Sequence, residues 1–111
     1  AFGQLGSVYT TASSDAIKPP TDKVFVAITM LADAVFDASG GLIADIPVYG
    51  SDQYIGTEEP AHDLAAGSET ADEGSGGQVV DSVVFPKGVT IYGRWTEIDV
   101  DSGSVVAYIG A

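Results

Sequence analysis

The sequence predicts a mainly β fold, an antiparallel β-sandwich or barrel-like domain with one long acidic loop that could hold a short helix. The apolar segments are short and rich in Val, Ile and Thr, residues that favour pleated, half-buried positions. Turn-forming residues recur at intervals of about 8–12 residues in the last third of the chain, a spacing typical of antiparallel sandwiches and barrels. With 111 residues, of which 45% are hydrophobic, the chain is expected to form one domain around one core.

The N-terminal residues 1–22 are predicted to form an arm or a strand that precedes the β-rich domain of residues 23–111. This segment is mixed in polarity, and its apolar residues include Phe2, Leu5, Val8 and Tyr9. A terminus of this kind either adds a strand to its own sheet or reaches onto a neighbouring molecule. The sequence leaves both alternatives open.

The first strand of the domain is predicted over residues 23–31, KVFVAITML. Alternate residues of a strand fall on opposite faces, and both faces of this segment are largely apolar. Such a strand is expected at the centre of a sheet, between two covering layers. After a connection that turns at residues 39–41, a second strand is predicted over residues 41–49, where Pro47 indicates an edge or a bulge.

Residues 51–77 form an acidic excursion that interrupts the strand pattern. The excursion contains seven Asp and Glu residues and no Lys or Arg, and it ends in a stretch of Gly and Ser. Thr57 could cap a short helix that closes near Gly67. A loop of this length in a compact domain is usually functional or disordered.

The last third of the chain is predicted to be a β meander. Its strands are expected over residues 78–85, 89–97 and 104–109, and its turns over residues 86–88 and 99–103. Gly93 lies inside the second of these strands and indicates a bulge or the close approach of another group.

The charge balance of the chain restricts its partners. Sixteen Asp and Glu residues face four Lys and Arg residues, which gives a formal net charge of -12. Four scattered cations cannot form the basic surface that nucleic acid or an anionic membrane requires, so neither is an expected partner. We expect synthesis in a reducing cytoplasm, because the chain has no cysteine and its first residues, AFGQLGSVYTTASSD, show no secretory signal.

Residues suited to catalysis or to cofactor binding are scarce, so we expect no enzyme, no cofactor and no metal. The chain has no cysteine and a single histidine, His62. Residues 99–103 begin like a calcium loop, but Ser104 and Gly110 stand where that loop requires Gly and Glu. The pair Glu59 and His62 has a metal-ligand spacing, but no second helix is predicted to complete the site.

Three side chains of the strand over residues 89–97 are candidates for contact with a partner. Tyr92 and Arg94 share one face of this strand, whereas Trp95 lies on the opposite face. One interpretation places Trp95 in the core and leaves Tyr92 and Arg94 at the surface, with a carboxylate of the same chain beside Arg94. The other makes Tyr92 and Arg94 interface anchors, because these residue types are enriched among those that dominate binding energies.

Two segments, KVFVAITMLADAVFD and VVFPKGVTIYGRWTEIDVDSGSVVAYIG, resemble small structural proteins of tailed bacteriophages, notably those of marine phages and cyanophages. The shared features run over residues 24–36 and 84–110, somewhat over a third of the chain. The resemblance implies a virion component, in particular a head decoration or cement protein that sits on the assembled shell and reinforces it. Such proteins are β-rich and frequently trimeric, so the implied partners are the major capsid protein and further copies of the chain.

The sequence therefore supports two functional hypotheses. The first is a non-enzymatic decoration protein on the outer capsid surface of a virion, with an interface formed by Phe2, Leu5, Tyr9, Tyr92 and Arg94. The second is a receptor- or glycan-binding β-sandwich of a tail fibre or adhesin, with a surface formed by Tyr54, Tyr92, Arg94 and Trp95. A buried Trp95 would favour the first hypothesis, and a solvent-exposed Trp95 would favour the second.

Overall fold

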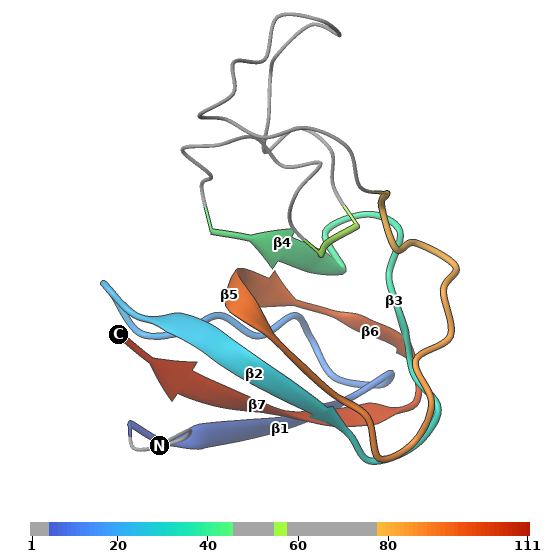
Figure 1. The fold of residues 1–111 in the computed structure, drawn as a ribbon, viewed down its shortest axis with the longest axis horizontal. Coiled ribbons are helices and arrows are strands. Elements are labelled where there is room, and N and C mark those ends of the chain that lie inside the picture. The colour runs from blue at the N-terminus through green and yellow to red at the C-terminus, as the bar shows by residue number, and fades with distance from the viewer. Residues whose placement is uncertain (1–4, 46–54, 58–77) are drawn as a thin grey trace, which may run out of the picture.

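The computed structural model describes residues 5–45, 55–57 and 78–111, which form seven β-strands (Figure 1). Five strands form one sheet in the order β1-β7-β2-β5-β4, and the other two pair as β3-β6. The strands are β1 (Ser7–Thr11), β2 (Val24–Met30), β3 (Val35–Phe36), β4 (Leu42–Ala44), β5 (Thr90–Ile98), β6 (Val100–Ser102) and β7 (Ser104–Gly110). Every strand pairing is antiparallel, so the prediction of a mainly β, antiparallel, sandwich-like domain is confirmed. These described residues contain no helix, and thus none long and apolar enough to cross a membrane.

Strand β2 lies at the centre of the five-stranded sheet, as its apolar sequence predicts. It pairs with β7 on one side and with β5 on the other. Phe25, Ile28 and Met30 are buried against the core. Ala27 and Thr29 point to the opposite face, which no described element covers, so the prediction of a layer on both sides is wrong for the described residues. The small and polar side chains of that face can be sheltered by their neighbours in the sheet and need no second layer.

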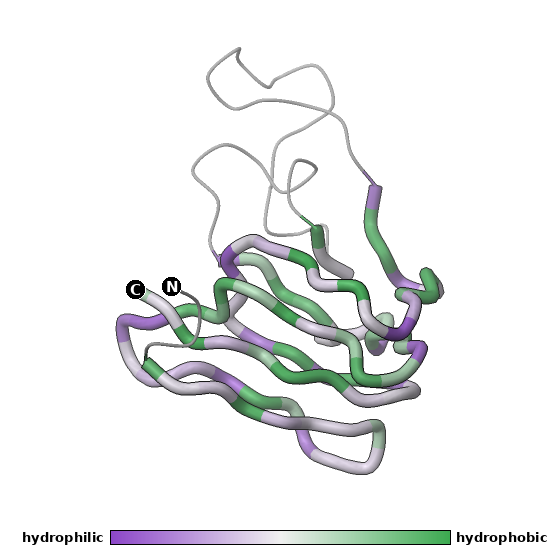
Figure 2. Tube along the Cα trace, turned by 60° about the horizontal axis from the view of Figure 1, so that its bottom comes forward, coloured by the Kyte–Doolittle hydropathy of each residue, from purple (hydrophilic) through white to green (hydrophobic). Residues whose placement is uncertain are grey.

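The core lies between the inner face of the five-stranded sheet and the β3-β6 pair. Phe36 and Val100 contribute fully buried side chains from this pair, and the rings of Phe36 and Phe85 meet edge to face with their centroids 5.5 Å apart. Full burial of a large apolar side chain stabilises a fold by about 1.5–3 kcal/mol. Figure 2 shows hydrophobic residues alternating with polar ones along the strands, as expected for a sheet with one side toward the core.

The predicted strand over residues 78–85 is wrong. The chain turns at Asp81 and Ser82, and only Phe85 of this segment joins a ladder, through an isolated bridge with Ala34. Two of its valines are exposed, whereas the Phe85 ring packs against the core. The anchoring of one aromatic ring therefore decides the path of this segment and overrides the β propensity of its valines.

The predicted turn over residues 99–103 contains a short strand, β6, that was not predicted from the sequence. Val100 of β6 is buried and pairs with Phe36 of β3. Burial of its side chain in the core therefore favours an extended backbone at this position. The tight part of the turn lies at Gly103, where φ is 90°. Strands β5 and β7 lie within a residue or two of the predicted strands over residues 89–97 and 104–109, which confirms both of them.

The N-terminal segment adds a strand to its own sheet, one of the two alternatives that the sequence left open. Strand β1 pairs with β7 along its whole length, and Ile17 forms an isolated bridge with Ile98. The predicted strand over residues 41–49 is seen as β4 at the other edge of the sheet. Pro47, the predicted helix after Thr57 and most of the acidic excursion lie outside the described residues.

Candidate interaction surface

Two rows of side chains cross the outer face of the five-stranded sheet, over β1, β7, β2 and β5. Directly paired residues of an antiparallel ladder point to the same side of the sheet, and so do residues two apart in a regular strand. The first row is Tyr9, Val106, Thr29 and Thr90, and the second row is Ser7, Tyr108, Ala27 and Tyr92. We call these eight residues the tyrosine face.

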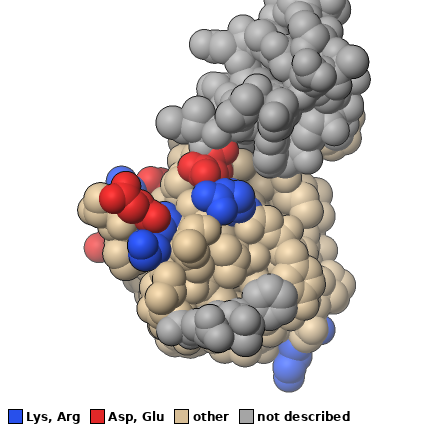
Figure 3. All heavy atoms as spheres, turned by 60° about the vertical axis from the view of Figure 1, so that its left-hand side comes forward, with Lys and Arg blue, Asp and Glu red and all other residues tan. Residues whose placement is uncertain are grey.

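The tyrosine face carries no charged side chain, on a protein with a formal net charge of -12. Tyr9 and Tyr92 are 62% and 58% exposed, and Tyr108 between their strands is half-buried. The hydroxyls of Thr29 and Thr90 share a hydrogen bond of 2.8 Å. Figure 3 shows charged side chains gathered in small groups, with a broad area in view that carries none. Protein interfaces are depleted in charge at their centres and enriched in tyrosine, so the composition of the tyrosine face is typical of a contact surface.

The structure brings two of the predicted interface residues, Tyr9 and Tyr92, onto one face. Neighbouring strands lie about 4.8 Å apart, so the three steps from β1 to β5 place these two strands about 14 Å apart, and Tyr9 and Tyr92 lie in adjacent rows. Leu5 is 52% exposed and precedes β1, whereas Phe2 lies outside the described residues. The other members of the tyrosine face were not predicted as interface residues from the sequence. The alternation of apolar residues in β7 could have indicated Tyr108.

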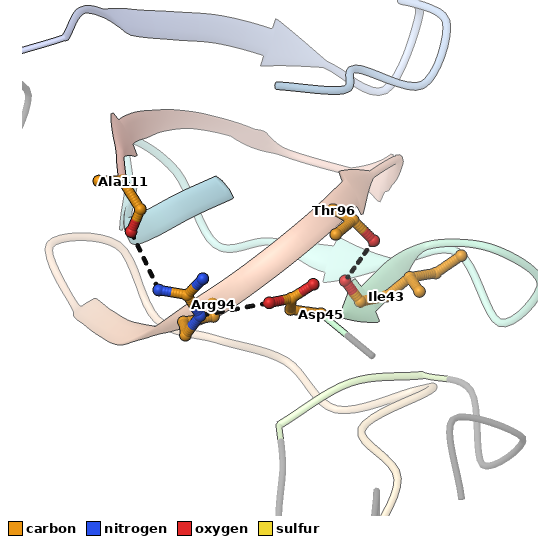
Figure 4. A network of polar contacts seen from close by, with 5 residues as sticks. All are labelled: Ile43, Asp45, Arg94, Thr96 and Ala111. Atoms are coloured by element: carbon orange, nitrogen blue, oxygen red, sulfur yellow. Dashed lines mark hydrogen bonds and ion pairs between the residues drawn. The ribbon is translucent and has the colours of Figure 1, made fainter. Parts of the chain in front are cut away.

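Arg94, the remaining predicted interface residue, is engaged by its own chain (Figure 4). Its Nε donates to Asp45 Oδ2 at 3.3 Å, and its Nη1 donates to the main-chain oxygen of Ala111 at 3.0 Å. The Asp45 N–H donates in turn to the Arg94 carbonyl oxygen at 2.8 Å. These contacts confirm the expected carboxylate partner. They also join the end of β4 to β5 beside the tyrosine face, although an exposed ion pair of this kind adds little stability.

Trp95 lies on the core side of β5, opposite Tyr92, as one interpretation of the sequence predicts. Its side chain is 1% exposed, and its Nε1 donates to the Ile55 carbonyl oxygen at 2.7 Å. The register of the β2-β5 ladder shifts beside Gly93, and a Cβ at that position would lie 2.9 Å from the indole ring. The prediction of a bulge or close approach at Gly93 is thus confirmed, and the indole is not available to a ligand at the surface.

A group of acidic side chains lies at the end of β5. Partial burial and the neighbouring Asp37, which also shares a hydrogen bond, raise the pKa of the Asp99 carboxyl above its ordinary value, and Glu97 and Asp15 add to this effect. The Lys18 ammonium lies 3.4 Å from Glu97 Oε1. Within the described residues, no three His, Asp or Glu side chains are arranged to hold a metal ion. The expected effect of the acidic group is therefore on how the stability of the fold depends on pH.

Asp99→Asn is expected to raise the urea midpoint of unfolding at pH 7. Since the pKa of Asp99 is raised in the folded state, stability from this group is complete below the unfolded pKa, near pH 4, and is lost as the pH rises through the folded pKa. The advantage of Asp99→Asn should therefore shrink as the pH falls toward about 4. Asp101→Asn in β6 removes an equal charge from an exposed residue nearby and serves as the control. Equal gains in both variants would assign the effect to net charge instead.

Comparisons with known proteins found no relative: no protein family, no curated protein and no solved structure matches this chain. The fold and the surface together define a class, an antiparallel, sandwich-like β domain whose outer sheet face presents a group of uncharged side chains beside the Arg94–Asp45 pair. Of the surface expected for a receptor- or glycan-binding domain, Tyr92 and Arg94 are exposed, Trp95 is buried and Tyr54 lies outside the described residues.

Proposed function

We propose that this chain is a non-enzymatic virion structural protein, a decoration (cement) protein that binds the outer surface of a phage head through the tyrosine face. The observation that carries the proposal is the tyrosine face, eight uncharged residues that include Tyr9, Tyr92 and Tyr108 and that lie beside the Arg94–Asp45 pair on a strongly acidic protein. The resemblance of residues 24–36 and 84–110 to phage structural proteins supplies the partner, the major capsid protein.

A flat sheet face suits attachment to a shell because attachment requires contact area and no cleft. Tyrosine provides a large, rigid contact area at a low cost in conformational entropy, and its hydroxyl can donate or accept a hydrogen bond. The ladders of β1, β7, β2 and β5 already fix the backbone that carries these side chains. Binding therefore costs little additional conformational entropy. Many copies, each covering a seam between shell subunits, would together oppose the outward pressure of packaged DNA.

The alternative, a receptor- or glycan-binding β-sandwich, receives less support. It needs the Trp95 indole at the surface, and this indole is buried with its N–H bonded to the Ile55 carbonyl oxygen. Tyr92 and Arg94 are common to both hypotheses, and Arg94 is engaged by Asp45 and Ala111. The geometry of β5 therefore favours the decoration protein.

The first test is the copy number of this chain in purified phage particles from the culture that produces it. Mass spectrometry on gradient-purified particles should find it in a fixed ratio to the major capsid protein, at one copy per shell subunit or per symmetry axis. A much smaller number would place the chain in the neck, tail or fibres. Absence from the particles would overturn the virion assignment.

The second test concerns the surface itself. Tyr92→Asp places a carboxylate on the tyrosine face and is expected to weaken binding to particles made without the chain by at least about tenfold. Val84→Asp is the matched control, since Val84 and Tyr92 are both 58% exposed and Val84 lies off this face. Equal binding of both variants would show that another surface attaches. Point substitutions are preferable to removal of residues 1–20, because β1 and Ile17 belong to the fold.

A further inference from the structure

The two edge strands of the five-stranded sheet, β4 and β1, differ in whether their outward main-chain groups are hydrogen-bonded within the chain. At one edge, β4 is covered by the segment of residues 55–57 (Figure 1). The Thr57 N–H donates to the Leu42 carbonyl oxygen at 2.8 Å, and the Leu42 N–H donates to Thr57 Oγ1 at 3.0 Å. The Thr57 hydroxyl oxygen thus accepts the hydrogen bond that a carbonyl oxygen of a neighbouring strand would otherwise accept. The outward main-chain groups of Leu42 are thus satisfied within the chain.

At the other edge, β1 directs main-chain groups away from the sheet. The Ile109 N–H donates to the Gly6 carbonyl oxygen at 2.8 Å, and the Ala12 N–H donates to that of Gly103 at 3.2 Å. In an antiparallel ladder, successive residues direct their N–H and C=O groups alternately toward the partner strand and away from it. Gly6 and Ala12 direct these groups toward β7, so Ser7 and Tyr9 direct theirs outward. Among residues 5–45, 55–57 and 78–111, no strand pairs with β1 on that side.

The exposed edge of β1 lacks the features that usually prevent pairing with another strand. Natural edge strands are protected by Lys, by Pro, by inward charges or by bulges, and β1, SVYTT, contains none of these. Moreover, residues 1–14 contain no Asp, Glu, Lys or Arg, and the first charged residue is Asp15. Two copies of a chain with a net charge of -12 repel each other, so their contact is favoured where no like charges are brought together. The β1 edge provides such a place.

We propose that β1 pairs with β1 of a second copy of this chain, in antiparallel orientation, across a two-fold axis perpendicular to the sheet. This arrangement is closed and uses the same surface on both copies. The outward main-chain groups of Ser7 and Tyr9 supply the hydrogen bonds, as in other cases of strand addition. The two sheets become one continuous sheet, and the two tyrosine faces lie on the same side of it. The pairing therefore doubles the attachment surface without depending on a shell.

Light scattering during gel filtration tests the proposal on the full chain. The wild type is expected to show twice the 11.3 kDa mass of one chain. Tyr9→Pro removes an outward N–H, which an edge strand tolerates, and is expected to yield a monomer with an unchanged circular dichroism spectrum. Tyr9→Thr keeps that N–H while removing the ring, and it should remain a dimer. A monomeric or trimeric wild type, or a monomeric Tyr9→Thr, would overturn pairing through the β1 edge.

Hydrogen exchange of the wild type gives a readout that does not depend on the folding of a variant. The amide of Tyr9 should exchange at least about tenfold more slowly at high protein concentration than at low concentration, since pairing would protect it. Exchange that is independent of concentration would contradict the proposal. Tyr92→Asp distinguishes this proposal from shell attachment, because Tyr92 lies three strands from the edge. It should lose binding to particles and still form dimers.

Discussion

Trp95→Ala is expected to lower the free energy of unfolding by about 3–5 kcal/mol, a large part of the stability of a domain of this size. The indole is 1% exposed and belongs to the core cluster with Phe25, its partner on β2. Truncation would leave a cavity beneath β5 and would leave the Ile55 carbonyl oxygen without the N–H that it accepts at 2.7 Å. Urea unfolding followed by circular dichroism measures the loss, since the chain has no other Trp to report by fluorescence.

Trp95→Phe is the matched control for this result. It keeps an aromatic ring in the core but removes the indole N–H, so the expected loss is smaller, about 1–3 kcal/mol. Both variants lack the N–H that bonds to Ile55, so the difference between their losses measures the packing of the aromatic ring that Phe retains. If Trp95→Ala cost no more than Trp95→Phe, the indole would not be a packing element of the core, and the assignment of Trp95 to the inner face of β5 would be wrong.

Gly103→Ala is expected to destabilise the fold by more than about 3 kcal/mol. Gly103 forms the turn between β6 and β7 with φ at 90°, a conformation that side chains rarely adopt. A Cβ at this position would also overlap the Asp33 carbonyl oxygen and would lie 2.9 Å from Ala34 Cα. Both neighbours are main-chain atoms, so the β6-β7 turn or the residues before β3 would have to move.

Gly88→Ala separates these two effects. Gly88 has φ at 88°, almost the value at Gly103, but a Cβ there would meet no atom within 4 Å. Only the conformational cost should remain, about 1–2 kcal/mol. Urea unfolding of both variants gives the comparison. Similar losses of unfolding free energy for Gly88→Ala and Gly103→Ala would show that the main chain of Asp33 and Ala34 shifts at little cost to make room for the added Cβ.

The strands with the clearest apolar patterns could be predicted from the sequence. Val24–Met30 and Thr90–Ile98 were found because runs of β-branched and aromatic residues end at well-defined turns. Residues 78–85 have a similar composition but form no strand, because the ring of Phe85 anchors the segment to the core and none of residues 5–45, 55–57 and 86–111 forms a ladder beside its valines. Composition cannot reveal whether a partner strand is within reach.

The candidate surface was predictable only in part. Tyr9 was predicted as an interface residue from the apolar character of the N-terminal segment, and Tyr92 as a residue type common at interfaces. One of the two interpretations of the sequence placed Trp95 in the core, where the structure has it. That Tyr9 and Tyr92 share a face with Tyr108 follows from the ladders that place β7 and β2 between β1 and β5. The internal contacts of Arg94 with Asp45 and Ala111 depend on the same arrangement.

The sequence by itself determined the β class, the central place of β2 and the acidity of the chain, because these follow from local propensity, two-residue alternation and composition. The tertiary structure decided which strands became neighbours, and with them the tyrosine face and the exposed edge of β1. Strand order is set by pairing and packing between segments that are distant along the chain. The residues of one segment do not encode which other segment will lie beside it.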